Sequence, residues 1–139
     1  MKRITAVGVL AVAVFTLSGC VSSPSPFDGE RKAGDELPAV FSDIPISGDT
    51  STSRYQGQAD GHRLYLVKAA TGDLQFCLAY TDGTKEGSGS SCSGGTWVKT
   101  TLPDRAEFEV QLNGFTDAPA AGEKQISPWV RQTSRARGA

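Results

Sequence analysis

Apolar and polar residues alternate with a period of two over much of the chain after residue 37, which is the pattern of half-buried β-strands. Residues 62–69 (HRLYLVKA) carry apolar side chains on both faces, which predicts a central strand covered on both sides. Residues 106–112 (AEFEVQL) place apolar side chains inward and acidic ones outward, as in an exposed antiparallel strand. Further strands are predicted over residues 53–59, 74–80 and 95–102, with an edge segment over 126–131.

Turn residues separate these strands at short intervals. Asp60-Gly61 is a dipeptide that favours a tight hairpin, because both residues tolerate positive φ. The Gly/Ser-rich residues 87–91 (GSGSS) indicate a loop, and no segment shows a helical stripe. We therefore expect an all-β domain over residues 38–131, a small antiparallel β-sandwich or partly open barrel.

The first residues have the pattern of an export signal. Lys2 and Arg3 precede an apolar run over residues 4–17. At 1.5 Å per residue, a helix of this length reaches roughly 21 Å, which is shorter than the ~30 Å hydrocarbon core of a bilayer. The run therefore suits a secretory signal better than a membrane span.

The sequence Leu17-Ser18-Gly19-Cys20 resembles the lipobox of bacterial lipoproteins. The resemblance implies cleavage after residues 1–19, attachment of lipid to Cys20, and a location on the outer face of the cytoplasmic membrane. Two or more acyl chains make such anchoring stable. An ordinary cleaved signal with an incidental cysteine, or an uncleaved anchor, is the alternative.

Both ends of the expected domain are polar. Residues 20–37 are rich in Ser, Pro, Gly and charges, and residues 132–139 are basic. Neither stretch carries enough apolar surface to offset the entropy of ordering, so we expect a disordered tether and a disordered tail. Arg131, Arg135 and Arg137 also suggest contact with anionic headgroups or an acidic wall polymer, although a solvated tail is the simpler interpretation.

Composition limits the classes of function. The chain has 139 residues and a mass of 14.6 kDa, enough for one modest domain, and its low hydrophobic content excludes a polytopic membrane protein. Its net charge is −1, and loss of Lys2 and Arg3 with the signal makes the mature chain more acidic. We therefore expect no nucleic-acid partner.

Cys77 and Cys92 remain once Cys20 is assigned to lipid. An even number of cysteines in an exported domain predicts a disulfide, which is worth roughly 3 kcal/mol for a loop of about 15 residues. A reactive or metal-binding pair is the alternative, although neither a CxxC spacing nor a neighbouring histidine accompanies them.

The order Asp60-Gly61, LYLVKA, Gly72, FCLAY, Gly87 and Ser91-Cys92-Ser93 resembles small membrane-anchored lipoproteins of actinobacteria over about 35 residues. Those proteins share a core of two strands and a cysteine-bearing loop. The resemblance implies fold and anchoring, and it implies no activity.

Candidate chemistry is sparse. His62 is the single histidine, so a catalytic triad would need it together with Asp60 or a serine, and the simpler interpretation is a surface histidine beside a turn. We expect no metal and no cofactor, and we single out Trp97, Trp129 and Tyr65 as possible ligand or partner contacts. The sequence favours a non-catalytic binding module at the cell envelope, contacting an envelope protein or a wall component. An envelope enzyme or enzyme inhibitor is the alternative.

Overall fold

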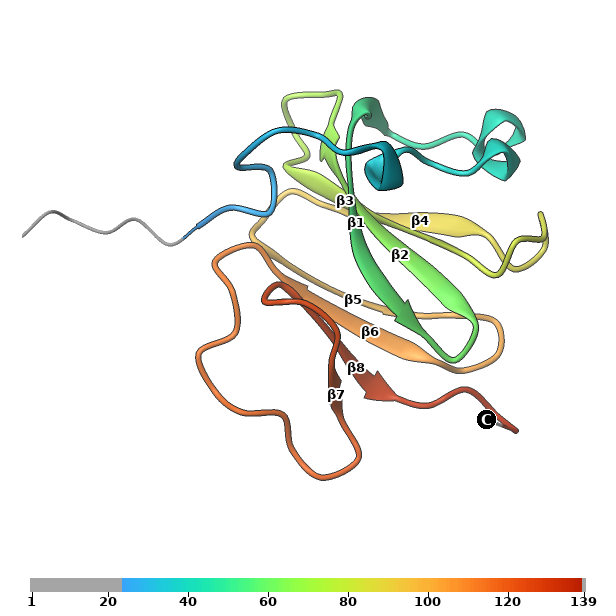
Figure 1. The fold of residues 1–139 in the computed structure, drawn as a ribbon, viewed down its shortest axis with the longest axis vertical. Helices are drawn as coiled ribbons and strands as arrows, with labels where there is room; N and C mark the ends of the chain where they lie inside the picture. Colours follow the sequence, from blue (N-terminus) through green and yellow to red (C-terminus); the bar gives the residue numbers. More distant parts are fainter. Residues whose placement is uncertain (1–23, 139) are drawn as a thin grey trace, which may run out of the picture.

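Two four-stranded antiparallel sheets form the protein, as the computed structural model shows for residues 24–138 (Figure 1). Sheet A has the strand order β1-β2-β3-β4, and sheet B has the order β5-β6-β8-β7. The all-β sandwich predicted from the sequence is confirmed, and neither sheet closes into a barrel. The elements in chain order are η1 (Ala33–Asp35), η2 (Ala39–Asp43), β1 (Gly48–Ala59), β2 (His62–Ala69), β3 (Phe76–Thr81), β4 (Gly89–Ser93), β5 (Trp97–Thr101), β6 (Glu107–Gln111), β7 (Lys124–Gln125) and β8 (Val130–Ser134).

The hairpin that begins sheet A forms as the sequence predicts. Asp60 and Gly61 adopt φ angles of 49° and 81°, which a two-residue turn between twisted strands requires. Strand β2 lies between β1 and β3, and it is buried on both faces. It is therefore the central strand that its apolar pattern predicts.

The main core lies between the two sheets. Phe76 and Leu78 of β3 face Phe108 and Val110 of β6, and all four side chains are fully buried. The predicted alternation of β6 is confirmed, because its glutamates lie on the opposite, more exposed face. The two sheets are thus held together by the inward rows of their inner strands.

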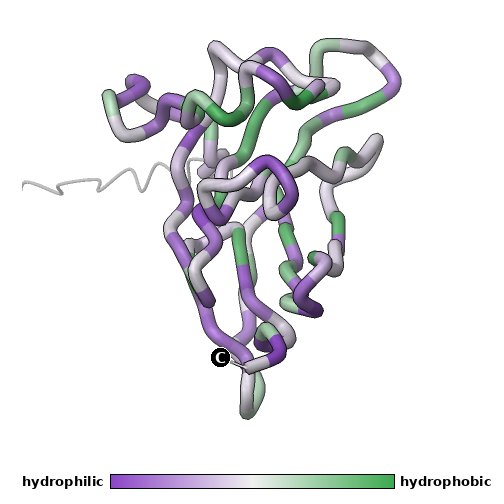
Figure 2. Tube along the Cα trace, turned by 90° about the vertical axis from the view of Figure 1, so that its right-hand side faces the viewer, coloured by the Kyte–Doolittle hydropathy of each residue, from purple (hydrophilic) through white to green (hydrophobic). Residues whose placement is uncertain are grey.

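A second, smaller core covers the outer face of sheet A. The short 3-10 helices η1 and η2 pack there, and Phe41 of η2 contacts a cluster with Tyr65, Val67 and Ala79. Figure 2 shows green, hydrophobic stretches in the strands and in this N-terminal segment. Sheet A therefore lies between sheet B and the η1–η2 layer, which explains why β2 has apolar residues on both faces.

The N-terminal segment differs from the disordered tether predicted over 20–37. Residues 24–37 pack against the domain: Pro26 is buried, Phe27 packs on the main core, and Trp129 Nε1 donates a hydrogen bond to the Pro24 carbonyl at 3.1 Å. The composition of the segment is polar, but its single aromatic side chain finds an apolar surface at the end of the sandwich. The remaining residues of the predicted tether, together with Cys20 and the signal peptide, lie outside the described residues.

Residues 87–91 were predicted as a loop, and this prediction is wrong for the second part of the stretch. Gly89–Ser93 forms β4, an edge strand that pairs with β3. All residues of β4 are half-buried. Its sequence therefore lacks the alternation of apolar and polar residues by which a strand is usually recognised. Pairing with a strong neighbouring strand and the disulfide supply the stability that β-propensity does not.

The C-terminal region also differs from the prediction. The edge segment expected over 126–131 is a tight turn up to Trp129, in which Ser127 Oγ accepts hydrogen bonds from the Trp129 and Val130 amides. Strand β8 begins at Val130 and continues through residues that were assigned to a disordered tail. Beyond it, the Ala136 amide donates to Asp60 Oδ2 at 2.8 Å, so the tail is anchored to the β1–β2 turn.

Candidate functional site

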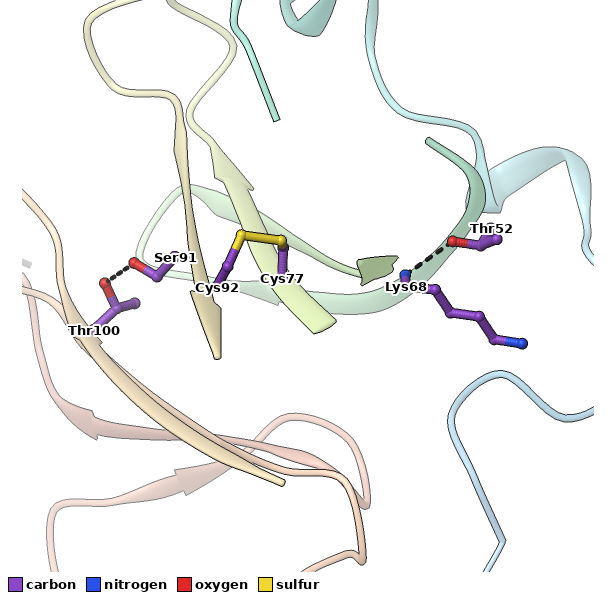
Figure 3. The surroundings of a disulfide bond; sticks show 6 residues. All are labelled: Thr52, Lys68, Cys77, Ser91, Cys92 and Thr100. Carbon is purple, nitrogen blue, oxygen red and sulfur yellow. Dashed lines mark hydrogen bonds between the residues drawn. A yellow bond between two sulfur atoms is a disulfide. The ribbon is translucent and has the colours of Figure 1, made fainter. Parts of the chain in front are cut away.

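The two cysteines of the domain form the predicted disulfide (Figure 3). Cys77 and Cys92 are direct cross-strand partners in β3 and β4. Ser91, beside Cys92, exchanges a hydrogen bond with Thr100 of β5 at 2.6 Å, so the bridged strand also links the two sheets. Across residues 24–138, no group of three His, Cys, Asp or Glu side chains is arranged to hold a metal ion. The disulfide joins β4 covalently to β3.

His62 is buried, with an exposed fraction of only 4%, rather than lying on the surface as predicted. Its Nε2 lies 2.5 Å from Asp104 Oδ2, and its ring edge faces Phe108. Asp60, the acidic partner considered from the sequence, instead accepts hydrogen bonds from Gln132 Nε2 and the Ala136 amide. The contact between His62 and Asp104 joins the start of β2 to the turn between β5 and β6.

The electrostatics of this pair favour an ionised carboxylate. Burial penalises the charge of Asp104, but hydrogen bonds from His62 and from the Ala106 amide outweigh it and lower the pKa of Asp104. The Nδ1 atom of His62 is buried and has no hydrogen-bond partner among the described residues. The contact between His62 and Asp104 links the two sheets, because His62 belongs to β2 and Asp104 to the turn between β5 and β6.

A concave surface lies between the N-terminal segment and β1. Two adjoining hollows, of about 220 and 320 Å³, share Glu36, Leu37 and Thr50. We call them together the N-terminal groove. Its further lining residues are Arg31, Pro38, Ala39, Phe41, Ser42 and Ser51.

The N-terminal groove is built by an interruption of the β1–β2 ladder. Regular pairing stops after Asp49 and resumes at Arg54, so the residues between them bulge away from β2. The Asp49 carboxylate accepts hydrogen bonds from the side chain and amide of Ser51, which lower the pKa of Asp49 and fix the bulge. Arg31 closes the groove from the other side, where its Nη2 donates to Ser53 Oγ at 2.8 Å.

The chemistry of the N-terminal groove is mixed. It carries one guanidinium from Arg31, one carboxylate from Glu36, and the hydroxyls of Thr50 and Ser51. Leu37 and the buried Phe41 contribute apolar walls. Such a lining binds a ligand that has both apolar and hydrogen-bonding groups.

The outer face of sheet B carries the most exposed large side chain. Trp97 is 52% exposed, and its Nε1 donates to Glu109 Oε1 at 2.8 Å. The same oxygen accepts a hydrogen bond from Gln111 Nε2, while Lys99 pairs with Glu107 at 3.1 Å and lowers the pKa of Glu107. Both glutamates are therefore engaged with neighbours on this face.

The three contact residues singled out from the sequence lie in different environments. Tyr65 is fully buried under the η1–η2 layer and offers no surface for a ligand, so that prediction is wrong. Trp129 is half-buried, and Trp97 lies two strands away from it. Neither tryptophan lines the N-terminal groove.

The basic C-terminal residues do not act as one patch. Arg131 is buried beneath the loop that precedes β7: it stacks on Phe115, with its Cζ 4.1 Å from the ring centroid, and pairs with Asp117 and Glu123. Arg137 is exposed instead. A buried arginine that binds its own loop is a structural residue.

Sequence reasoning missed the N-terminal groove because Arg31, Glu36 and Leu37 fall in the stretch assigned to the tether, and its other lining residues precede the first predicted strand. It missed Asp104 because this residue is 42 positions away from His62. Among residues 24–138, no helix is long and apolar enough to cross a membrane. Comparison with protein-family models, curated proteins and solved structures gives no match for this chain.

Proposed function

We propose that this protein is a lipid-anchored, extracytoplasmic binding module whose N-terminal groove binds an extended peptide segment of an envelope protein. The observation that carries the proposal is the lining of the groove. Opposite charges, two hydroxyls and apolar walls lie within one hollow surface that the fold builds beside an edge strand.

The groove matches the chemistry of a peptide in three respects. The Thr50 hydroxyl offers a hydrogen bond to a peptide backbone, and Ser51 Oγ, which donates to Asp49, still accepts one. Arg31 and Glu36 offer charges to side chains of either sign. Leu37 and Phe41 give an apolar side chain a place to bury surface. Recognition of extended segments in pockets beside a sheet edge is a common mode of peptide binding.

The position of His62 favours binding over an enzymatic role. A general base must reach the proton that it removes. His62 is almost fully buried, its Nε2 is engaged with Asp104, and it lies outside the lining of the N-terminal groove.

Anchoring rests on Cys20 and the residues before it. The expected mature chain begins at Cys20 with a diacylglyceryl group on its sulfur, and it stays in the membrane fraction after a high-salt wash. Cys20→Ala releases the protein or blocks its processing, while Ser18→Ala keeps a small residue in the lipobox and changes neither. A membrane-bound, fully processed Cys20→Ala protein would contradict the anchoring.

Site-specific photo-cross-linking in the producing cell tests the groove. A photoreactive side chain at Ser42, in the N-terminal groove, is expected to give a discrete cross-linked protein, and Arg31→Glu is expected to remove it. The control is the same side chain at Thr101, which is exposed on β5. Equal products from both positions, or a product that is wall glycan instead of protein, would overturn the assigned partner.

A further inference from the structure

Both tryptophans of the domain lie at the end of the sandwich where the chain enters. The Pro24 carbonyl accepts a hydrogen bond from Trp129 Nε1 at 3.1 Å. Gln111 lies between the two tryptophans in the sheet: it is the cross-strand partner of Trp97, and its amide donates to the Trp129 carbonyl at 3.0 Å. We call this the entry end, and in Figure 1 it lies on the side where the blue, described part of the chain begins.

The C-terminus lies at the opposite end. Strands β5 and β8 both run away from the entry end, and after β8 the Arg137 amide donates to the Asp104 carbonyl at 2.9 Å, in the turn that follows β5. Five residues of strand span about 17 Å at ~3.4 Å per residue. The exposed Arg137 is therefore at least one strand length away from the tryptophans.

The distance from Cys20 to the entry end is limited by covalent geometry. Pro24 follows Cys20 by four positions in the sequence. A fully extended chain covers at most ~3.6 Å per residue, so the Cα atom of Cys20 lies within about 14 Å of the Cα atom of Pro24. Because residues 24–37 pack on the sandwich, they add nothing to this reach.

We propose that the entry end rests on the lipid surface, with Trp97 and Trp129 at the level of the headgroups. The inference rests on acylation of Cys20, which belongs to the proposed function. Tryptophan is the side chain that most favours the membrane–water interface, because its ring is apolar and its indole nitrogen donates a hydrogen bond. Trp97 is more than half exposed within the region that the short link confines to the membrane.

The orientation has a consequence for the arginines. Arg137 faces away from the bilayer, so it does not bind the headgroups of the membrane that holds the protein. The N-terminal groove lies on the outer face of sheet A, at the side of the molecule, and stays open to a partner in the envelope.

Fluorescence quenching in vesicles tests the inference. The full-length acylated protein is reconstituted in phosphatidylglycerol–phosphatidylcholine vesicles that contain a phospholipid spin-labelled near the headgroup. Trp129→Phe leaves Trp97 as the only tryptophan of the chain, and excitation at 295 nm avoids the tyrosines. We expect the spin label to reduce the emission of Trp97 at least twofold. In the control chain both tryptophans are replaced by Phe and Arg137 is replaced by Trp. The spin label is expected to reduce the emission of this control by less than one fifth.

A longer link provides the matched comparison. Insertion of about fifteen Gly/Ser residues between Ser23 and Pro24 gives the chain a flexible reach that lets the domain leave the surface. Quenching of Trp97 is expected to fall by at least half. Because Trp129→Phe removes an indole that packs on the core, the unmodified chain with both tryptophans is measured alongside and is expected to respond in the same direction.

Mass spectrometry of the same sample separates the two proposals. If Cys20 is acylated and Trp97 is quenched no more than the Arg137→Trp reporter, the orientation is wrong while the anchoring stands. If Cys20 carries no lipid, the anchoring fails and the orientation fails with it. Strong quenching of Trp97 that does not change with link length also overturns the proposed orientation. In that case the short link would not be what brings Trp97 to the membrane.

Discussion

Replacement of both bridged cysteines is expected to lower the free energy of unfolding by about 3 kcal/mol. Cys77 and Cys92 are 15 residues apart, and in the chain-entropy account a closed loop of this size restricts the unfolded chain by that amount. A domain of this size has a stability of roughly 5–15 kcal/mol. The double variant Cys77→Ala, Cys92→Ala therefore loses a large share of it.

The structure also indicates where the loss appears first. β4 is an edge strand whose residues are all half-buried, and it pairs only with β3 within sheet A. Two hydrogen bonds link it to β5 of sheet B: one between the Ser91 and Thr100 hydroxyls, and one from Ser93 Oγ to the Trp97 carbonyl. Amides of β4 are expected to exchange with solvent faster in the double variant, while those of β2 keep their protection.

Urea unfolding under non-reducing conditions, followed by far-UV circular dichroism, measures the effect. Ser91→Ala is the matched control, because it changes β4 and leaves the disulfide in place. It is expected to cost about 1 kcal/mol or less, the typical worth of one hydrogen bond. A double variant that loses no more than this control would refute the reasoning.

Three further changes test other parts of the structure. Phe108→Ala, in the fully buried core, is expected to cost about 3–5 kcal/mol in urea unfolding, and a cost below about 1 kcal/mol would contradict its central place. The folded pKa of Asp104 is lowered, so its contribution to stability is present above the unfolded pKa of about 3.9 and is lost as the pH falls through the folded value. In the Asp104→Asn variant, the free energy of unfolding should therefore fall less steeply with pH between pH 5 and pH 2 than in the unmodified protein. An unchanged pH dependence would show that the contact with His62 carries no such effect. Arg131→Met is expected to expose the loop at Phe115 to chymotrypsin faster, with global stability falling less than for Phe108→Ala, and an unaltered cleavage rate would show that the stacking does not hold the loop.

The strands that the sequence predicted well are those with strong local signals. The Asp60-Gly61 turn and the apolar pattern of β2 determine the first hairpin without help from distant residues. The alternation of β6 is equally local. Hydrophobic period and turn chemistry act within a few residues, so these elements are readable from the sequence alone.

The elements that sequence reasoning missed depend on distant partners. β4 has a loop-like composition, and it becomes a strand because β3 lies beside it and Cys92 is bridged to Cys77. β8 carries the polar run that follows Val130, and its burial comes from β6, the loop before β7 and the tail that folds back. Tertiary context overrides propensity in both places.

The candidate site was hidden for a related reason. Residues 24–37 carry few apolar side chains, and composition alone predicts disorder. Phe27 and Phe41 nevertheless find apolar surface on the finished sheets, one at the entry end and one on the outer face of sheet A. Groove residues such as Arg31 and Glu36 take their positions only once that packing exists.

Asp35 of η1 occupies part of the outer edge of β1. Its Oδ1 accepts a hydrogen bond from the Tyr55 amide, and its carbonyl accepts one from the Ser53 hydroxyl. An unpaired strand edge offers its N–H and C=O groups to a strand of another copy. The contact with η1 removes this part of the β1 edge from such pairing and so limits self-association through it.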